Sequence, residues 1–178
     1  IERIKKNLFE MLSDREYSFN KNTYFVREDG FSTIKGKTNK KKNFTVILIE
    51  KIGVHFLRKI TEDLDIQNIH FIFIYTRDIT TFSKKKIRSL LPSFELFHYI
   101  FFLMNPTKHK FVPKHLLLDE ISKEKMLLKY NPEDFPKILK RDPICKYYNF
   151  KQNDIVKIER PLLNGITMDV YRIVTSSI

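Results

Sequence analysis

The segment FTVILI, residues 44–49, is a short apolar run rich in β-branched residues, and IHFIFIY, residues 69–75, is a second. Between them, residues 54–64 carry apolar side chains at helical spacing. This pattern predicts a strand, a helix and a strand. A right-handed crossover of this kind usually makes the two strands parallel and buries both of their faces, which explains why neither run alternates strictly between apolar and polar residues.

The amino-terminal flank of these strands predicts a helix followed by a loop. Residues 4–13 place apolar side chains on one helical face and charged side chains opposite, which is typical of an amphipathic helix. Residues 35–43 contain five lysines and Gly36, a residue type that commonly interrupts regular structure. We expect an exposed loop there.

The carboxy-terminal flank predicts a basic helix, a third strand and a domain boundary. Ser83 is expected to cap a helix over residues 84–91, which Pro92 ends. Residues 94–104 form a third apolar run, and its aromatic content favours a strand. The apolar periodicity then stops at Asn105-Pro106-Thr107, so we place the boundary there.

Two helices are predicted beyond the boundary. Asp119 can cap the first, which is expected to run to Tyr130. Asp142 followed by Pro143 predicts the start of the second, because proline's fixed φ suits the first helical position and its missing N–H would be unpaired there anyway. This helix is short, and Asn149 can end it in the left-handed conformation.

Two alternating segments predict a β-hairpin near the carboxy terminus. Residues 155–159 and 170–174 alternate apolar and polar side chains, which is typical of half-buried strands. Asn164-Gly165 lies between them and suits a tight turn that requires positive φ. The expected fold class is therefore mixed α+β, with an α/β amino-terminal domain and a small α+β carboxy-terminal domain.

The composition is that of a folded protein that attracts polyanions. The chain has 178 residues, 42% of them hydrophobic, and a net charge of +12. This charge favours nucleic acid as a partner, although nucleotide bias in an AT-rich genome would also enrich lysine. Cys145 is the single cysteine, so no intrachain disulfide is possible. No apolar run has the length of a membrane span and no secretory signal is evident, so we expect an intracellular location and no membrane partner.

Zinc and nucleotide sites are not expected. His109, His115 and Cys145 do not match a common zinc spacing and lack a fourth ligand. The four glycines are isolated, so no phosphate-binding loop is predicted. We therefore expect no metal, no cofactor, no small-molecule ligand and no catalytic residues.

A metal-dependent nuclease is the alternative interpretation. Glu50-Lys51 at a strand end resembles part of such a site, although the usual spacer residue is missing. Asp29, Asp63 and Asp65 could supply a second carboxylate, but no pattern places them near Glu50. Cleavage of DNA by the pure protein with Mg²⁺ or Mn²⁺ would distinguish this hypothesis.

The basic segment at residues 84–88 is the clearest candidate for nucleic-acid contact. It opens a helix preceded by hydroxyl side chains, and hydroxyls, backbone N–H groups and cations together suit a phosphate backbone. A solvated helix face explains the charge equally well, and a free DNA-binding module remains a third interpretation. The candidate DNA-contact residues are Thr80, Thr81, Ser83, Lys84, Lys85 and Arg88.

Several segments of the carboxy-terminal part together indicate a family. They are HKFVPKH at 109–115, LLKY at 127–130, DPICKYY at 142–148, DIVKIERP at 154–161 and YRIV at 171–174. In this order they resemble the shared fifth subunit of eukaryotic nuclear RNA polymerases and its archaeal counterpart. Residues 12–17 resemble the family's early Asp-Arg-Gly-Tyr, and Phe44-Thr45-Val46, Thr80 and Lys84 also match, so the resemblance spans nearly the whole chain.

The resemblance implies a non-catalytic subunit of a multisubunit DNA-directed RNA polymerase. It implies a jaw domain over residues 1–105, with a nuclease-like fold and no active site, that faces double-stranded DNA downstream. It also implies an assembly domain over residues 106–178 that docks on the largest subunit, among other polymerase subunits. The partner-binding candidates carried over by motif are His109, Pro113, His115, Asp142, Pro143, Tyr147, Arg160 and Arg172.

The chain departs from the family pattern at some of these places. Thr81 replaces the proline of the loop and Asn43 an aspartate, so the DNA contacts of the jaw are open. Lys110 and Lys114 replace two glutamates, so we expect a changed docking surface. Divergence and composition favour a large DNA virus as the source, with a protist as the alternative; the location would be the cytoplasm or virion in the first case and the nucleus otherwise.

Overall fold

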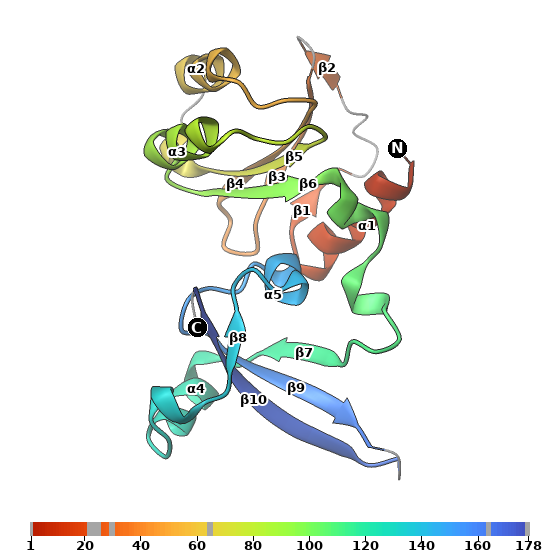
Figure 1. The fold of residues 1–178 in the computed structure, drawn as a ribbon, viewed down its shortest axis with the longest axis vertical. Helices are drawn as coiled ribbons and strands as arrows, with labels where there is room; N and C mark the ends of the chain where they lie inside the picture. The colour runs from red at the N-terminus through yellow and green to blue at the C-terminus, as the bar shows by residue number, and fades with distance from the viewer. Residues whose placement is uncertain (1, 21–25, 29–30, 64–65, 163–164, 177–178) are drawn as a thin grey trace. The chain divides into compact units, whose positions relative to one another are not determined.

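The computed structural model describes residues 2–20, 26–28, 31–63, 66–162 and 165–176. The chain divides into two compact units, Ile1–Met104 and Asn105–Ile178 (Figure 1). The jaw and assembly roles expected for residues 1–105 and 106–178 stay predictions. Within the described ranges, no helix combines the length and the apolar character that crossing a bilayer requires.

Two parallel strands form the centre of the amino-terminal unit. β4 (Asn43–Ile49) lies beside β5 (Ile69–Tyr75), with Val46 opposite Ile72. Helix α2 (Val54–Asp63) connects them. The middle residues of both strands are buried, as both faces of the sheet are covered. The predicted strand, helix and parallel strand are therefore confirmed.

The remaining strands of this sheet flank the central pair. β3 (Phe31–Lys37) is antiparallel to β4, and β6 (Phe94–His98) is parallel to β5. Two short strands, β1 (Ser18–Phe19) and β2 (Val26–Glu28), pair with β3. The described part of the sheet thus runs β1-β3-β4-β5-β6, with β2 beside β3.

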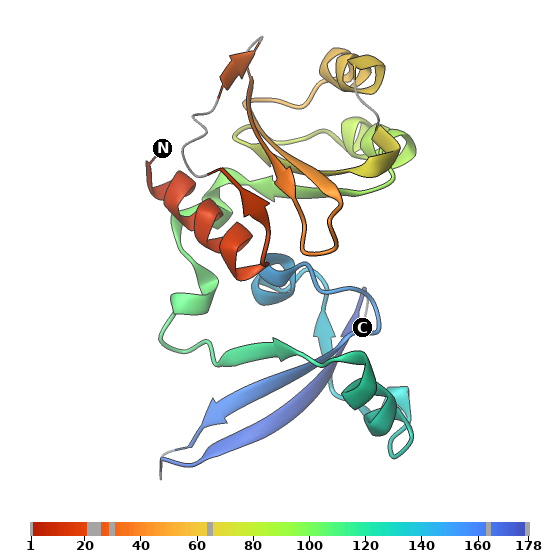
Figure 2. The same ribbon diagram turned by 180° about the vertical axis from the view of Figure 1, so that it is seen from behind.

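Helices cover both faces of this sheet (Figures 1 and 2). On one face, α2 and α3 (Thr81–Leu90) pack over β4 and β5. On the other face, α1 (Glu2–Asp14) contributes the buried residues Leu8, Met11 and Leu12. The core under α2 and α3 includes Ile47, Leu57, Ile60, Phe71, Phe73 and Ile87.

Residues 35–37 belong to β3 and Asn43 begins β4, so the loop expected over residues 35–43 is wrong at both ends. β3 pairs with β4 up to Lys37 opposite Asn43, and residues 38–42 form the turn. A Cβ at Gly36 would lie 2.3 Å from the Ser18 carbonyl oxygen and 2.7 Å from the Phe44 ring. Glycine therefore permits the close approach of β1 and Phe44 instead of interrupting the strand.

The third apolar run is a strand only as far as His98, so the strand expected up to Met104 is wrong in its second half. Residues Tyr99–Leu103 form a 3-10 helix, η2. The Phe97 ring lies 4.8 Å from the Phe101 ring and 5.3 Å from the Phe102 ring, measured between centroids. The chain has to turn here because these rings pack back on Phe97.

The carboxy-terminal unit is built on a four-stranded sheet of order β7-β9-β10-β8. β9 (Ile155–Pro161) and β10 (Thr167–Thr175) are antiparallel, which confirms the predicted hairpin. β7 (Lys114–Leu117) is antiparallel to β9, and β8 (Lys137–Leu139) is parallel to β10. Gly165 has a φ of +79°, and Asn164, the other residue of the predicted turn, lies outside the described residues.

Helix α4 (Glu120–Leu127) begins as predicted and ends early. Asp119 Oδ1 accepts a hydrogen bond from the Ser122 N–H at 2.9 Å, which confirms the cap. The helix was expected to reach Tyr130. The N–H groups of Lys129 and Tyr130 both bond the Met126 carbonyl, so a turn replaces the last helical residues.

Helix α5 (Pro143–Tyr148) has the predicted cap at each end. Asp142 Oδ1 accepts from the Ile144 N–H at 2.8 Å, and Asn149 has a φ of 56°. Both predictions are confirmed. The described chain also contains three short 3-10 helices, η1 (Ile66–Asn68), η3 (Pro106–Lys108) and η4 (Pro132–Asp134).

A buried polar cluster holds the end of α1 to the sheet. The Arg15 guanidinium bonds both carboxylate oxygens of Glu95, at 2.7 and 2.9 Å. His70 Nε2 lies 2.7 Å from the same carboxylate, and its Nδ1 lies 2.6 Å from Ser93 Oγ. Burial acts to raise the pKa of Glu95, but the charge of Arg15 and the hydrogen bonds lower it to about 2. The carboxylate is therefore ionised in the folded unit.

Replacement of Glu95 by Gln is expected to lower the free energy of unfolding by about 3 kcal/mol, because it leaves the Arg15 charge buried without its carboxylate. The pKa of Glu95 in the folded chain is about 2, below the usual 4.5. The wild-type chain should therefore lose stability as the pH falls from about 5 towards 2, and the variant should lack this part of the loss. Urea unfolding at pH 7 and pH 3 measures both effects.

The matched control for this experiment is the double variant Arg15→Met, Glu95→Leu. Removal of both charges leaves no unpaired ion, so we expect it to be more stable than Glu95→Gln alone. Equal stability of Glu95→Gln and wild type at pH 7 would contradict the role given to the ion pair.

Candidate nucleic-acid and partner interfaces

Helix α3 begins three residues earlier than its sequence predicts. Its N-cap is Thr80, whose Oγ1 accepts a hydrogen bond from the Ser83 N–H at 3.2 Å and donates one to Ser83 Oγ at 3.0 Å. Ser83, the expected cap, lies inside the first turn and is 5% exposed. Its side chain is not available to a phosphate, which corrects its inclusion among the DNA-contact candidates.

The rest of α3 buries one side and exposes its cations. Ser83, Ile87 and Leu91 follow one another at a spacing of four residues, and all three are buried. Within the described parts of the chain, no carboxylate forms an ion pair with the basic side chains of this helix. The exposed candidates are Thr80, Thr81, Lys84, Lys85 and Arg88, with Lys86 beside them.

Those residues of the nuclease alternative that the structure describes do not gather into a site. The exposed Glu50 carboxylate lies 2.6 Å from Arg77 Nη2. Asp63 is the last residue of α2, and Asp29 and Asp65 lie outside the described residues. Among the residues that the structure describes, no three His, Cys, Asp or Glu side chains could hold a metal ion.

The sheet of the carboxy-terminal unit has two unlike faces. The pairing of Ile158 with Val170 and with His115 puts even-numbered residues of β9 and β10 and odd-numbered residues of β7 on one face. We call it the α5 face, because Ile144 and Cys145 of α5 pack there. The opposite side is the α4 face. It carries Phe135, Ile155 and Ile173, packed with Met126 of α4.

Four of the motif residues meet at the α5 face. His115, Arg160 and Arg172 all project from the sheet on this side. The pKa of His115 is lowered, first by burial and then by the charges of Arg172 and Arg160. A 2.7 Å hydrogen bond with the Pro113 carbonyl and the charge of Asp142 act in the opposite direction. Residues far apart in the sequence are thus electrostatic neighbours.

The other partner candidates have different surroundings. Tyr147 is 1% exposed, and its hydroxyl accepts from Asn105 Nδ2 at 3.2 Å. Its ring fills the core, which corrects its inclusion among the partner-binding residues. Pro143 is exposed at the first position of α5. His109 is exposed on the loop before β7, with its ring 5.9 Å from the Phe111 ring.

An exposed apolar stripe continues from this cluster along the hairpin, and the sequence interpretation missed it. Met168, Ile166 and Leu162 are 45%, 60% and 42% exposed. All three lie on the α5 face, since the Leu162 N–H donates to the Ile166 carbonyl and extends the β9–β10 register. The signal in the sequence was that apolar residues continue at alternate positions before Val170, at Met168 and Ile166. Apolar surface beside cations is typical of a protein interface.

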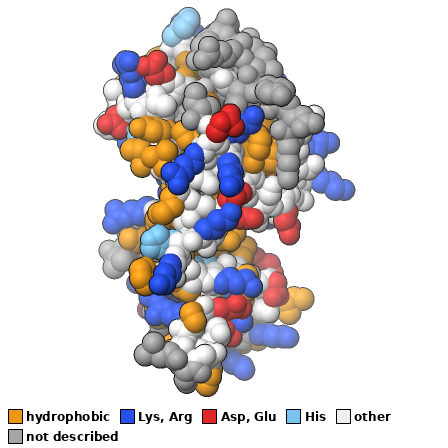
Figure 3. All heavy atoms as spheres, turned by 90° about the vertical axis from the view of Figure 1, so that its right-hand side faces the viewer, with side chains coloured by type: hydrophobic (Ala, Val, Ile, Leu, Met, Phe, Trp, Pro, Cys, Tyr) orange, Lys and Arg blue, Asp and Glu red, His pale blue; other side chains and the backbone are white. Residues whose placement is uncertain are grey.

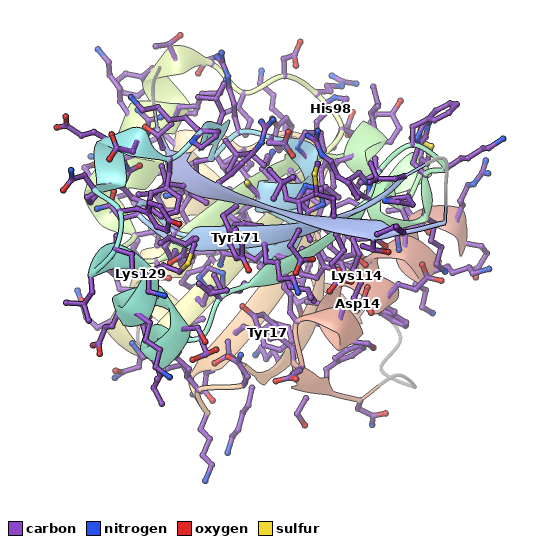
Figure 4. All side chains as sticks on the ribbon, turned by 90° about the horizontal axis from the view of Figure 1, so that it is seen from below. Asp14, Tyr17, His98, Lys114, Lys129 and Tyr171 are labelled. Carbon is purple, nitrogen blue, oxygen red and sulfur yellow. The ribbon has the colours of Figure 1, made fainter. Side chains whose placement is uncertain are left out.

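The α4 face of the hairpin carries paired charges instead. Lys157 Nζ lies 2.9 Å from Asp169 and 3.4 Å from Glu159, and Lys114 Nζ lies 3.6 Å from Glu159. The pKa of Lys157 is raised, chiefly by its hydrogen bond with Asp169. Figure 4 labels Lys114 and Tyr171 near these strands, and Figure 3 shows hydrophobic side chains interspersed with basic ones on the visible surface. Mutually neutralised charges suit a solvated face.

Comparisons with known proteins point to one family. Residues 104–174 match the family model described as RNA polymerase Rpb5, C-terminal domain. The chain is 29% identical over 187 residues to DNA-directed RNA polymerases I, II, and III subunit rpabc1 of Dictyostelium discoideum, covering 96% of this chain and 95% of that protein. It is 29% identical over 129 residues to subunit RPABC1 of Caenorhabditis elegans, covering 70% and 61%. It is 25% identical over 195 residues to DNA-directed RNA polymerase subunit 5-like protein 1 of Arabidopsis thaliana, covering 96% and 93%.

The assignment of the α3 cap can be tested by a pair of substitutions. Thr80→Ala should lower the free energy of unfolding by about 1 kcal/mol, because the helix loses the acceptor for a free N–H of its first turn. Ser83→Ala removes the hydroxyl of the residue expected from sequence and should cost less. Chemical denaturation followed by circular dichroism measures both. A larger loss for Ser83→Ala would contradict the observed cap.

Proposed function

We propose that the chain belongs to the RNA polymerase Rpb5 family and that it is a non-catalytic subunit of a multisubunit DNA-directed RNA polymerase. The observation that carries the proposal is the family match of residues 104–174, the region in which His115, Asp142, Arg160 and Arg172 come together. Relatives named as polymerase subunits align with most of the chain, which supports the same role here. Nucleotide addition belongs to other subunits.

The carboxy-terminal unit docks on the largest polymerase subunit through its α5 face. Arg160 and Met168 are exposed there side by side, and Arg172 continues the cationic surface towards α5, next to His115. An apolar stripe with a cationic border fits a partner surface that is apolar at its centre and acidic at its rim. Lys114 is bonded to Glu159 on the α4 face, so its charge is not part of this surface.

The amino-terminal unit acts as a jaw with a nuclease-like fold that faces downstream duplex DNA. The supporting feature is α3, whose Lys84, Lys85 and Arg88 are exposed and make no ion pair within the described residues. Exposed cations contact phosphates without reading base sequence, so they would hold DNA of any sequence. Thr80 and Thr81 add hydroxyl groups at the start of the helix.

Purification of the tagged chain from its native source tests the subunit role. We expect very large polypeptides to co-purify, together with DNA-dependent incorporation of ribonucleotides. Recovery of the chain alone, or a polymerase that is complete without it, would refute the proposal. Metal-dependent DNA cleavage by the isolated chain would support the nuclease alternative instead.

Arg160→Glu should weaken binding of the full chain to the largest subunit by about tenfold or more, because it places a carboxylate on a surface that we expect to meet acidic groups. Lys125→Glu is the matched control, since it makes the same charge change at an exposed position of α4. Surface plasmon resonance measures both dissociation constants. Equal effects of the two variants would mean that net charge, and not the α5 face, governs docking.

The triple variant Lys84→Ala, Lys85→Ala, Arg88→Ala should bind duplex DNA more weakly and with less dependence on salt. Loss of three phosphate contacts should reduce the slope of log affinity against log salt concentration by about 2 to 3. Titration of the full chain with a labelled duplex at several salt concentrations gives this slope.

The control for the DNA experiment is Lys40→Ala, Lys41→Ala, Lys42→Ala, which removes the same charge from the exposed turn between β3 and β4. We expect a smaller change in slope for this variant. If the two triple variants behave alike, the attraction is diffuse and α3 is not the contact surface.

A further inference from the structure

Successive residues of β10 direct their backbone N–H and C=O groups alternately towards β8 and towards β9. The Ile173 N–H donates to the Pro136 carbonyl at 3.0 Å, and the Thr175 carbonyl accepts from the Lys140 N–H at 2.8 Å, both on the β8 side. The Val174 N–H donates to the Asp154 carbonyl at 2.8 Å, on the β9 side. Because successive residues of a strand point their backbone groups to opposite edges, odd-numbered residues of β10 face the β8 side.

That edge is open over most of its length. β8 pairs only with residues 173–175 of β10, as Figures 1 and 2 also show. The outward N–H and C=O groups of Thr167, Asp169 and Tyr171 make no backbone hydrogen bond within the described chain. Each is a strand position that can still pair with another chain.

The other edge of the hairpin is protected and this one is not. β7 covers β9 from Val156 to Glu159, and the next outward residue is Pro161, which has no N–H to offer. The open stretch of β10 contains no proline. Its charged residue, Asp169, is neutralised by Lys157 at 2.9 Å, so it does little to repel an incoming strand.

The side chains beside the open edge favour a particular partner. On the α5 face, Met168 is 45% exposed and Val170 is half-buried. Arg172 lies next along this face. Its Nη1 donates to the Lys137 carbonyl at 3.4 Å, but its Nε is buried with no hydrogen-bond partner among the described residues. A buried donor of this kind is costly unless an acceptor joins it.

We infer that an extended segment of a partner protein adds to β10 as a further strand. Its backbone pairs with Thr167, Asp169 and Tyr171, its apolar side chains lie beside Met168 and Val170, and a carboxylate accepts from Arg172 Nε. This rests on the proposed function, because we assign the segment to the largest polymerase subunit. A nucleic acid does not fit this edge, since a phosphate backbone supplies acceptors but no matching row of donors.

A second copy of this chain fits less well than a different protein. Antiparallel pairing of two β10 edges keeps both α5 faces on the same side of the joined sheet. The β10 residues on that face are Met168, Val170, Arg172 and Val174, and none of them has a carboxylate. The Arg172 Nε atom would therefore stay without an acceptor.

The test compares two substitutions at one position. Asp169→Pro removes an outward N–H and leaves the hydrogen bonds to β9, while Asp169→Ala keeps the N–H and removes the same carboxylate. We expect Asp169→Pro to bind the purified largest subunit about tenfold more weakly than Asp169→Ala, because one backbone pair is lost and the proline ring obstructs the added strand. Thr167→Pro, at another outward position, should act in the same direction and covers the case in which Asp169→Pro does not fold.

The outcomes separate this inference from the proposed function. If the proline and alanine variants are equally folded and bind alike, the added strand is refuted while docking stands. If the wild-type chain does not bind the largest subunit at all, the proposed function fails. If sedimentation shows wild-type dimers that Asp169→Pro abolishes, the edge joins two copies and the heterologous partner is wrong.

Arg172→Lys, which keeps the charge and loses Nε, should weaken binding to the largest subunit as well. Unchanged binding of this variant would contradict the carboxylate contact.

Discussion

The register of β9 against β10 determines what the carboxy-terminal unit presents to other molecules. Val156 and Ile158 lie on the α5 face, so their even-numbered neighbour Arg160, paired with Met168, lies there too. A slip of one residue would bring Lys157 and Glu159 under α5 and move Arg160 to the opposite face. The core therefore fixes the position of the exposed cations, because the apolar half of each strand cannot change face without losing its burial.

In the amino-terminal unit, the motif at residues 14–17 has an architectural explanation. Arg15 bonds Glu95, and its guanidinium carbon lies 5.8 Å from the centre of the Tyr17 ring. Glu16 has a φ of 59°, and the Tyr17 N–H bonds the Leu12 carbonyl, which is the geometry that glycine favours at the end of a helix. The family motif that this segment resembles has glycine at this position. The motif therefore ends α1 and anchors it to the sheet.

Local signals predicted much of the fold, and contacts between distant segments account for the errors. The β4–β5 pair, the hairpin and the caps at Asp119 and Asp142 follow from periodicity and from residue types at adjacent positions. Gly36 was misinterpreted because its neighbour across the sheet, Phe44, decides its role.

The candidate site shows the same division between local signals and contacts of distant segments. Thr80 and Ser83 carry the same chemical group, so sequence could not choose the cap. His115 lies near Arg160 and Arg172 only because β7, β9 and β10 pair side by side. The open edge of β10 depends on where β8 ends, and the sequence of β10 itself does not indicate that position.

The distribution of charge bears on whether composition alone explains the excess of cations. Nucleotide bias adds lysines without regard to where they fall, so it predicts no relation between a cation's position and its pairing. On the α4 face, Lys114 and Lys157 are neutralised by Glu159 and Asp169. On α3, the cations are exposed and form no ion pair within the described residues. Neighbouring cations without carboxylate partners repel one another and so destabilise the free chain. An anionic partner would remove this repulsion. The exposed cations of α3 therefore suit an anionic partner better than the paired lysines of the α4 face do.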